Sequence, residues 1–119
     1  MRLRPPLETW VTKSQFRKGN VFYPTRVGFP RPRSAEERSM DLLIQEMDAA
    51  GIELGVIMGR QSNEPQGSIP NDEIADCVSK YPNRFVAWAG IDLSQPPEWW
   101  LGEIRRCVKL AGFKGVSIE

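Results

Sequence analysis

The chain has 119 residues, 40% hydrophobic and 26% charged, which is the composition of one ordinary globular domain with a core of its own. No apolar run approaches the roughly 20 residues needed to cross a bilayer, and the start "MRLRPP" lacks the apolar segment of a signal peptide. These features predict a cytoplasmic protein with no membrane partner.

The net charge of +1 is the sum of two unlike parts. Residues 1–33 hold eight Lys/Arg and one acid, whereas residues 34–119 hold eight Lys/Arg and fourteen acids. A basic arm could bind an anionic partner, so a small anion-binding module is one possible function. The acidic remainder would repel phosphates, and we therefore expect no nucleic-acid partner.

Residues 1–33 contain five of the ten prolines and show no sustained hydrophobic period. They predict a long proline-rich, basic loop that follows a residual strand 1. Long loops inside compact domains are usually functional or disordered. Several aromatic residues argue against disorder and favour a packed excursion over a substrate.

Residues 34–59 predict a helix followed by a buried strand. Ser34 and Glu37 have the spacing of a capping box at the start of the helix. Met40, Leu43 and Met47 recur on one face, and Gly51 is suited to end the helix. The segment "LGVIMG" (54–59) is then a short apolar strand.

The same cycle occurs twice more. Asn71 is a candidate cap for a helix through Tyr81, and "RFVAWAGI" (84–91) is the next strand. Pro96 and Pro97 suit the first turn of a third helix, since a missing N–H has little effect there. We expect this helix to bury Trp100, Ile104, Val108 and Ala111. Gly112 ends it, and "FKGVSI" (113–118) is the last strand.

The three apolar strands lack polar alternation, which is typical of parallel strands. Their starts lie about 30 residues apart, the length of one βα unit in a (β/α)₈ barrel. The predicted fold is therefore α/β: the N-terminal part of a (β/α)₈ TIM barrel, about strands 1–4, with residues 34–119 as its βα units. A doubly wound sheet is the structural alternative, although it needs about five strands.

Three motifs carry a resemblance to a known family. "MDAAGI" (47–52), "YPNRF" (81–85) and "GFKGV" (112–116) occur in order at suitable spacing. The chain thus resembles the amidohydrolase-related family, a branch of metal-dependent hydrolases and decarboxylases that includes aminocarboxymuconate semialdehyde decarboxylase. The resemblance covers residues 34–119 and implies a barrel enzyme that acts on a small carboxylated substrate by hydrolysis or decarboxylation.

The chain departs from this family at its start. Members end strand 1 in His-x-His, which binds zinc or another divalent metal, but this chain contains no histidine. Arg2 and Arg4 in "RLRPP" have that spacing, and arginine cannot act as a metal ligand. We therefore expect no metal to be bound by this chain alone. If strand 1 ends there, both guanidinium groups could hold a substrate carboxylate; the alternative is a solvated basic terminus.

Further candidate site residues follow the predicted strands. Arg60, Asp92 and Glu119 come just after strands 2, 3 and 4, where barrel enzymes gather their catalytic groups. We expect Arg60 and Ser62 to bind substrate, and Asp92 and Glu119 to act in catalysis. The structural alternatives are a turn role for Asp92, ordinary loop chemistry for Ser62 and an Arg60–Glu119 ion pair.

The number of units is too small for a complete barrel. Cys77 and Cys107 share no CxxC spacing and are expected to be buried thiols. We expect this chain alone to be inactive. Because an open parallel sheet exposes backbone groups and apolar faces, it should form a homo-oligomer or join the remainder of a barrel. An inactive half-barrel that associates with another chain is thus a second alternative function.

Overall fold

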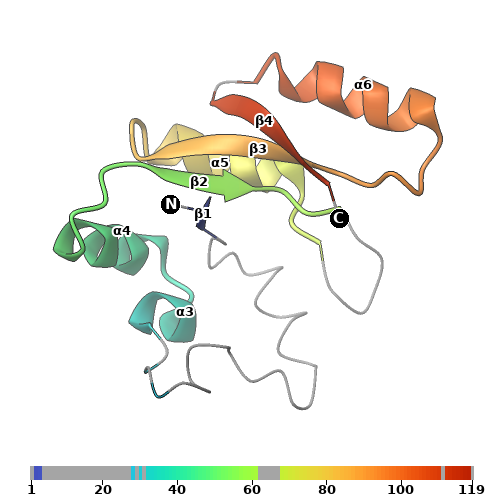
Figure 1. Cartoon of the computed structure of the whole chain (residues 1–119). Coiled ribbons are helices and arrows are strands. Elements are labelled where there is room, and N and C mark those ends of the chain that lie inside the picture. The colour runs from blue at the N-terminus through green and yellow to red at the C-terminus, as the bar shows by residue number, and fades with distance from the viewer. Residues whose placement is uncertain are drawn as a thin grey trace.

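The computed structural model describes residues 2–3, 28, 30, 32–61, 68–110 and 112–118. Four strands form one parallel sheet in the order β1-β2-β3-β4 (Figure 1). These strands are β1 (Arg2–Leu3), β2 (Gly55–Met58), β3 (Phe85–Ile91) and β4 (Phe113–Ile118). Neighbours in the sheet are neighbours in sequence, as in a TIM barrel, so the doubly wound alternative is wrong.

The sheet is in register over its central strands. Ile57 pairs with Ala87 and Ala87 with Phe113, after which a bulge in β4 shifts the pairing so that Ala89 lies beside Val116. The three predicted strands are confirmed to within about one residue. The division of the chain near residue 33 stays a prediction, because most of residues 1–33 lie outside the described part.

The first predicted helix is in fact two helices, α3 (Arg33–Glu37) and α4 (Met40–Ala49). The predicted capping box is wrong: α3 is capped by Pro32 without a side-chain bond, and the Ser34 hydroxyl donates to Glu46 at 2.5 Å. Arg38 breaks the helix with a left-handed backbone (φ 53°), and Ser39 caps α4 through the amide of Leu42. Local spacing suggested a cap, but a carboxylate twelve residues away binds Ser34 instead.

Helices α5 (Asn71–Lys80) and α6 (Pro97–Cys107) cover one face of the sheet. In Figure 1, α5 lies behind the strands and α6 lies next to β3 and β4. Alternate strand residues share a face, and those facing the helices pack with helix residues to form the core. The buried core includes Met47, Ile57, Ile74, Phe85, Ala87, Ala89, Ile91, Cys107 and Phe113.

The buried stripe of α6 differs from the prediction by one position near its end. Trp100 and Ile104 contact the core as expected, but Val108 is 66% exposed and Cys107 is buried in its place. Helix α6 ends at Cys107, whereas the predicted helix ran on to Ala111, so the periodic pattern was extended past the true end of the helix. Ala111 lies outside the described residues.

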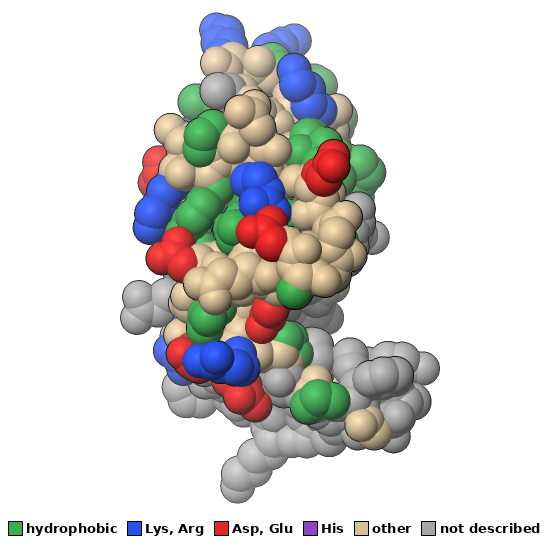
Figure 2. All heavy atoms as spheres, turned by 90° about the vertical axis from the view of Figure 1, so that its left-hand side faces the viewer, with side chains coloured by type: hydrophobic (Ala, Val, Ile, Leu, Met, Phe, Trp, Pro, Cys, Tyr) green, Lys and Arg blue, Asp and Glu red, His purple; other side chains and the backbone are tan. Residues whose placement is uncertain are grey.

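Arg84 links several parts of the chain at the amino ends of the strands. Its guanidinium donates to the carbonyl oxygens of Glu53 and Ile52 at 3.0 and 3.2 Å and pairs with Asp48 at 2.7 Å. This group joins the end of α4, the entry to β2 and the start of β3. Figure 2 views the molecule from this side, where basic and acidic side chains are mixed with hydrophobic ones. These contacts hold the backbone together at the amino ends of the strands, the face of a barrel that serves stability and not catalysis.

Candidate active site at the carboxyl ends of the strands

The carboxyl ends of β2 and β3 bring two of the predicted site residues to one edge of the sheet. Arg60 follows β2 and Asp92 follows β3 directly, and because the strands are parallel both residues leave the sheet on the same side. β4 ends at Ile118 on this side as well. The predicted location of the site at the strand ends is therefore consistent with the topology.

Two glycines allow β2 and β3 to approach closely at this edge. A Cβ atom on Gly90 would overlap the backbone of Gly59 and Arg60, and one on Gly59 would overlap the amide oxygen of Asn71. The Gly59 amide donates to the Trp88 carbonyl at 2.9 Å, which continues the ladder past the end of β2. Glycine is thus required at both positions by space.

Asn71 completes the hydrogen bonding of β3 where β2 ends. Its side-chain oxygen accepts from the Gly90 amide at 2.7 Å, and its side-chain nitrogen donates to the Gly90 carbonyl at 3.0 Å. Asn71 is only 1% exposed. The prediction that it caps α5 is wrong, because Pro70 is the cap residue and the amide side chain is used by the sheet.

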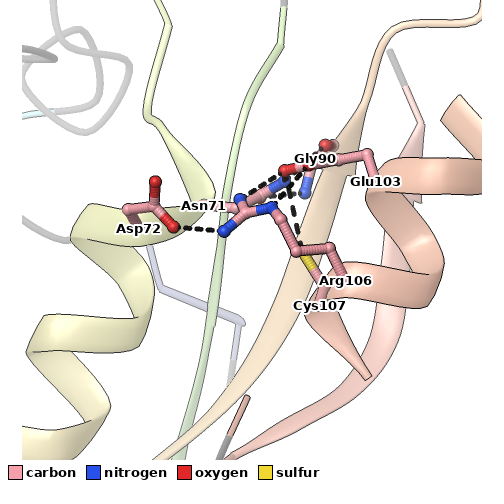
Figure 3. Close-up of polar contacts among 6 residues, drawn as sticks. All are labelled: Asn71, Asp72, Gly90, Glu103, Arg106 and Cys107. Atoms are coloured by element: carbon pink, nitrogen blue, oxygen red, sulfur yellow. Dashed lines mark hydrogen bonds and ion pairs between the residues drawn. The ribbon is translucent and has the colours of Figure 1, made fainter. Parts of the chain in front are cut away.

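The Asn71 amide belongs to a wider polar network between α5 and α6 (Figure 3). Its nitrogen also donates to the Glu103 carboxylate at 2.8 Å, and Arg106 donates to the same carboxylate at 2.7 and 2.8 Å. Arg106 pairs in addition with Asp72 at 2.5 Å. Hydrogen bonds from Arg106, and then from Asn71, lower the pKa of Glu103 to about 2 despite its partial burial.

This network was missed by the sequence reasoning. Asn71 was interpreted as a helix cap, and Glu103 falls beside the apolar stripe of α6 without any motif around it. The one available signal is that Glu103 lies one turn before buried Cys107, so that its side chain is close to the core. The network fixes the end of β3, and so the position of Asp92, relative to α5 and α6.

Arg60 lies at the start of the segment that links β2 to α5. Its amide and carbonyl form two hydrogen bonds of 2.8 Å with Ile69, which join the chain after β2 to the segment just before α5. The Arg60 side chain is half-buried at the strand end. A guanidinium held there by a fixed backbone has the chemistry to bind a carboxylate through two parallel hydrogen bonds.

Asp92 forms a turn at the end of β3. Its carboxylate accepts from the Ser94 amide at 2.9 Å and from the Gln95 side chain at 3.2 Å. Hydrogen bonds from Ser94 and then Gln95 hold the pKa of Asp92 below its usual range. The carboxylate is therefore ionised at neutral pH and can accept a proton or a hydrogen bond, while it also serves the turn role that was its structural alternative.

The remaining predicted site residues are not placed. Arg4, Ser62 and Glu119 lie outside the described residues, and only the backbone of Arg2 is described, as part of β1. Their assigned roles stay predictions.

The described residues do not fit a metal ion. Within residues 32–61, 68–110 and 112–118, no three His, Cys, Asp or Glu side chains gather as a ligand set. Cys77 and Cys107 are buried free thiols, and burial raises the pKa of each to about 11. They therefore stay protonated at neutral pH, as thiols of the core.

No described helix is long and apolar enough to span a bilayer.

Comparison with known proteins relates this chain to a decarboxylase and to a barrel. No family model matches it. Gamma-resorcylate decarboxylase of a Polaromonas species is 31% identical over 89 residues, which are 75% of this chain and 26% of that protein. The crystal structure of an uncharacterised TIM-barrel protein from Bordetella bronchiseptica is 31% identical and matches with a TM-score of 0.79, covering 98% of this chain and 41% of that one.

The chain thus spans a quarter to two-fifths of the length of these proteins. Both comparisons support the resemblance seen in the sequence at the level of an amidohydrolase-like portion of a TIM barrel. The predicted fold class, a partial α/β barrel of parallel strands with covering helices, is confirmed.

Proposed function

We propose that this chain is the part of an amidohydrolase-related decarboxylase that contributes strands 1–4, and that it binds a small aromatic carboxylate at the carboxyl ends of those strands. The observation that carries the proposal is the 31% identity to gamma-resorcylate decarboxylase over 89 residues. Because the chain spans 26% of that protein, we assign carboxylate binding to these residues and turnover to a complete barrel.

The residues at the strand ends suit the binding step. Arg60 would hold the substrate carboxylate by paired, charge-assisted hydrogen bonds. In decarboxylation the bond between the ring carbon and the carboxylate breaks, CO₂ leaves, and the electron pair on the carbon takes up a proton. Asp92 is ionised at neutral pH, so it would orient a substrate hydroxyl or accept a proton and would not be the proton donor.

The other predicted site residues belong to the same proposal. Arg2 and Arg4 would add positive charge from strand 1, and Ser62 would add a hydrogen bond from the β2 loop. Glu119, which follows β4 in the sequence, is the second candidate acid or base. The family usually uses zinc or another divalent metal, but the described residues do not fit one, so no step of the proposal passes through a metal.

The experiment is a titration of the purified chain with gamma-resorcylate, followed by NMR of the backbone amides. We expect shifts at Arg60 and Asp92 and a loss of affinity of roughly tenfold or more in Arg60→Gln, since a charged bidentate contact is removed. Arg33→Gln is the matched control, because Arg33 is exposed on α3, away from the strand ends, and pairs with Glu37 of the same helix. Equal affinity of the two variants would reject the assignment of Arg60.

Hydrolysis is the competing reaction class and would use the same binding residues. It is separated by the products of a complete barrel protein: release of CO₂ supports decarboxylation, whereas uptake of water into the products supports hydrolysis.

A further inference from the structure

Trp88 lies on the face of the sheet opposite the helices. Its neighbours in β3, Ala87 and Ala89, are buried in the helix-covered core, so by strand alternation the indole points to the other face. Trp88 is 37% exposed, whereas Ala87 and Ala89 are 0% and 2% exposed. An aromatic side chain with an open surface at this place is a candidate contact for a ligand.

The indole extends sideways from β3 over β4. Trp88 pairs with Gly115, and a Cβ atom on Gly115 would lie 2.7–2.9 Å from three indole atoms, Nε1, Cδ1 and Cε2. Because the three distances are nearly equal, this Cβ position lies over the face of the ring and not beyond its edge. Only glycine leaves room for the ring here, so one face of the indole lies against the β4 backbone and the other face is open.

The indole lies one layer below the candidate site at the strand ends. Trp88 pairs with Met58, the last residue of β2, and Arg60 follows Met58 by two residues. Gly90 shares the face of Trp88, and a Cβ atom there would meet the amide nitrogen of Arg60. The backbone of Arg60 therefore passes over this same face. Two residues rise about 7 Å along a strand, so the guanidinium and the indole can contact one small ligand together.

Met58 and Ser117 border the indole. The Ser117 hydroxyl donates to the Met58 sulfur at 3.5 Å, and this contact between β4 and β2 crosses β3 beside Gly90, which has no side chain to block it. A thioether is flexible and polarisable, and it packs favourably against aromatic rings. Met58 thus adds an apolar surface next to the indole.

We propose that Trp88 selects an aromatic ring: the open face of its indole stacks on the ring of a carboxylate whose charge is held by Arg60. Stacked aromatic pairs gain affinity beyond that of the area they bury. Gly115 is the positioning residue for the indole, because a side chain there would push the ring away from β4. The inference rests on the proposed function, since it requires a carboxylate at Arg60, and it adds the residue that distinguishes an aromatic acid from an aliphatic one.

The test compares two carboxylates of nearly the same size, benzoate and cyclohexanecarboxylate. Titrations of the purified chain are followed by NMR of the backbone amides and of the indole N–H groups. We expect benzoate to bind about fivefold more tightly than cyclohexanecarboxylate, and the Trp88 indole N–H to shift on addition of benzoate. The indole signal is assigned by its absence in Trp88→Leu.

The variants separate the ring from other effects. Trp88→Leu should bind the two acids about equally, whereas Trp88→Phe keeps a ring and should retain most of the preference. Gly115→Ala should reduce the preference with Trp88 still present, and the two Trp88 variants decide the question if this protein does not fold. Trp99→Leu is the matched control, since Trp99 is 43% exposed on α6, in the helix layer, and the preference should stay as in the wild type.

The role of Trp88 and the role of Arg60 fail in different ways. Arg60→Gln should weaken both acids by the same factor and leave the preference unchanged, because it removes only the charged contact. An unchanged preference in Trp88→Leu would overturn the role of Trp88 and show that its indole only packs on β4, while the strand-end site would stand. Equal affinity of the wild type for the two acids would overturn it as well, and binding of neither acid would overturn both proposals.

Discussion

Replacing Asn71 by aspartate should destabilise the chain strongly, although the side chain keeps its size and shape. The amide nitrogen donates to the Gly90 carbonyl at 3.0 Å and to the Glu103 carboxylate at 2.8 Å. Aspartate can make neither bond at neutral pH, and it places a second negative charge against Glu103. The oxygen that accepts from the Gly90 amide is retained.

The size of this loss of stability follows from the burial of Asn71. Asn71 is 1% exposed, so the Gly90 carbonyl would lose its side-chain partner without access to water, at about 1–3 kcal/mol. An uncompensated buried charge adds to this, and disruption of such a group typically totals about 3–5 kcal/mol. We therefore expect Asn71→Asp to lower the free energy of unfolding by about 3–5 kcal/mol at pH 7, a large part of the roughly 5–15 kcal/mol typical of a domain.

The assay is urea unfolding followed by tryptophan fluorescence, with Asn83→Asp as the matched control. Asn83 is exposed with a left-handed backbone (φ 64°), which aspartate also tolerates, so the control should be nearly neutral. The new carboxyl at position 71 would have a raised pKa, because burial and Glu103 both oppose its charge. Its penalty should therefore shrink as the pH falls from 7 toward about 4. Equal stability of Asn71→Asp and Asn83→Asp at pH 7 would refute the account of the network.

The other predictions concern the close approach of β2 and β3, the Glu103 carboxylate and the start of α4. Gly90→Ala should lower the free energy of unfolding by at least about 1–3 kcal/mol, because its Cβ would meet the Gly59 backbone. Gly102→Ala should raise it by up to about 1 kcal/mol, because a Cβ there meets open space in a helix. Thermal unfolding compares the two variants, and an equal loss of stability would contradict the close approach of β2 and β3. The pKa of Glu103 is lowered from 4.5 to about 2, so its contribution to stability is complete above about pH 4.5 and is lost as the pH falls toward 2. Glu103→Gln should be less stable than the wild type at pH 7, but its stability should change less between pH 4.5 and pH 2. Parallel curves of stability against pH for the two proteins would exclude this contribution of Glu103. Ser39→Ala should lower the free energy of unfolding by about 1 kcal/mol, because Ser39 caps α4. Ser79→Ala, on the exposed side of α5, is the control. Equally small effects of the two substitutions would show that Ser39 does not stabilise α4 as a cap.

The strands were predictable because their signals are local. Each of β2, β3 and β4 is a short apolar run bounded by Gly, Pro or a turn, and the spacing of about 30 residues indicates one βα unit. Gly51 and Gly112 end their segments with positive φ, as expected from sequence. The parallel order of the strands follows from these units, and it was predicted correctly.

The polar contacts were not predictable, because their partners are distant in sequence. Ser34 has the spacing of a cap but binds Glu46, and Asn71 has the position of a cap but binds Gly90, nineteen residues away. A capping residue and a buried hydrogen-bonding residue look alike until the fold brings a competing partner near. Val108 was assigned to the core because periodicity alone does not show where a helix ends.

The candidate site lies between these two cases. Strand direction alone places Arg60 and Asp92 at the carboxyl ends of their strands, as the sequence predicts, and their role in a site stays a prediction. Its detailed geometry depends on Gly59 and Gly90 and on the side chain of Asn71, none of which belongs to a catalytic motif. Residues that shape a site by backbone contact leave no chemical signature in the sequence.

The central claim is that β2, β3 and β4 are consecutive parallel strands whose carboxyl ends meet at one edge. Cross-strand nuclear Overhauser effects in the isotopically labelled chain test it most directly. Parallel pairing predicts contacts between Ala89 and Val116 and between Ile57 and Ala87, without the short Hα–Hα contacts that antiparallel strands give. Strong Hα–Hα contacts between β3 and β4 would contradict the barrel fold and the shared edge of Arg60 and Asp92.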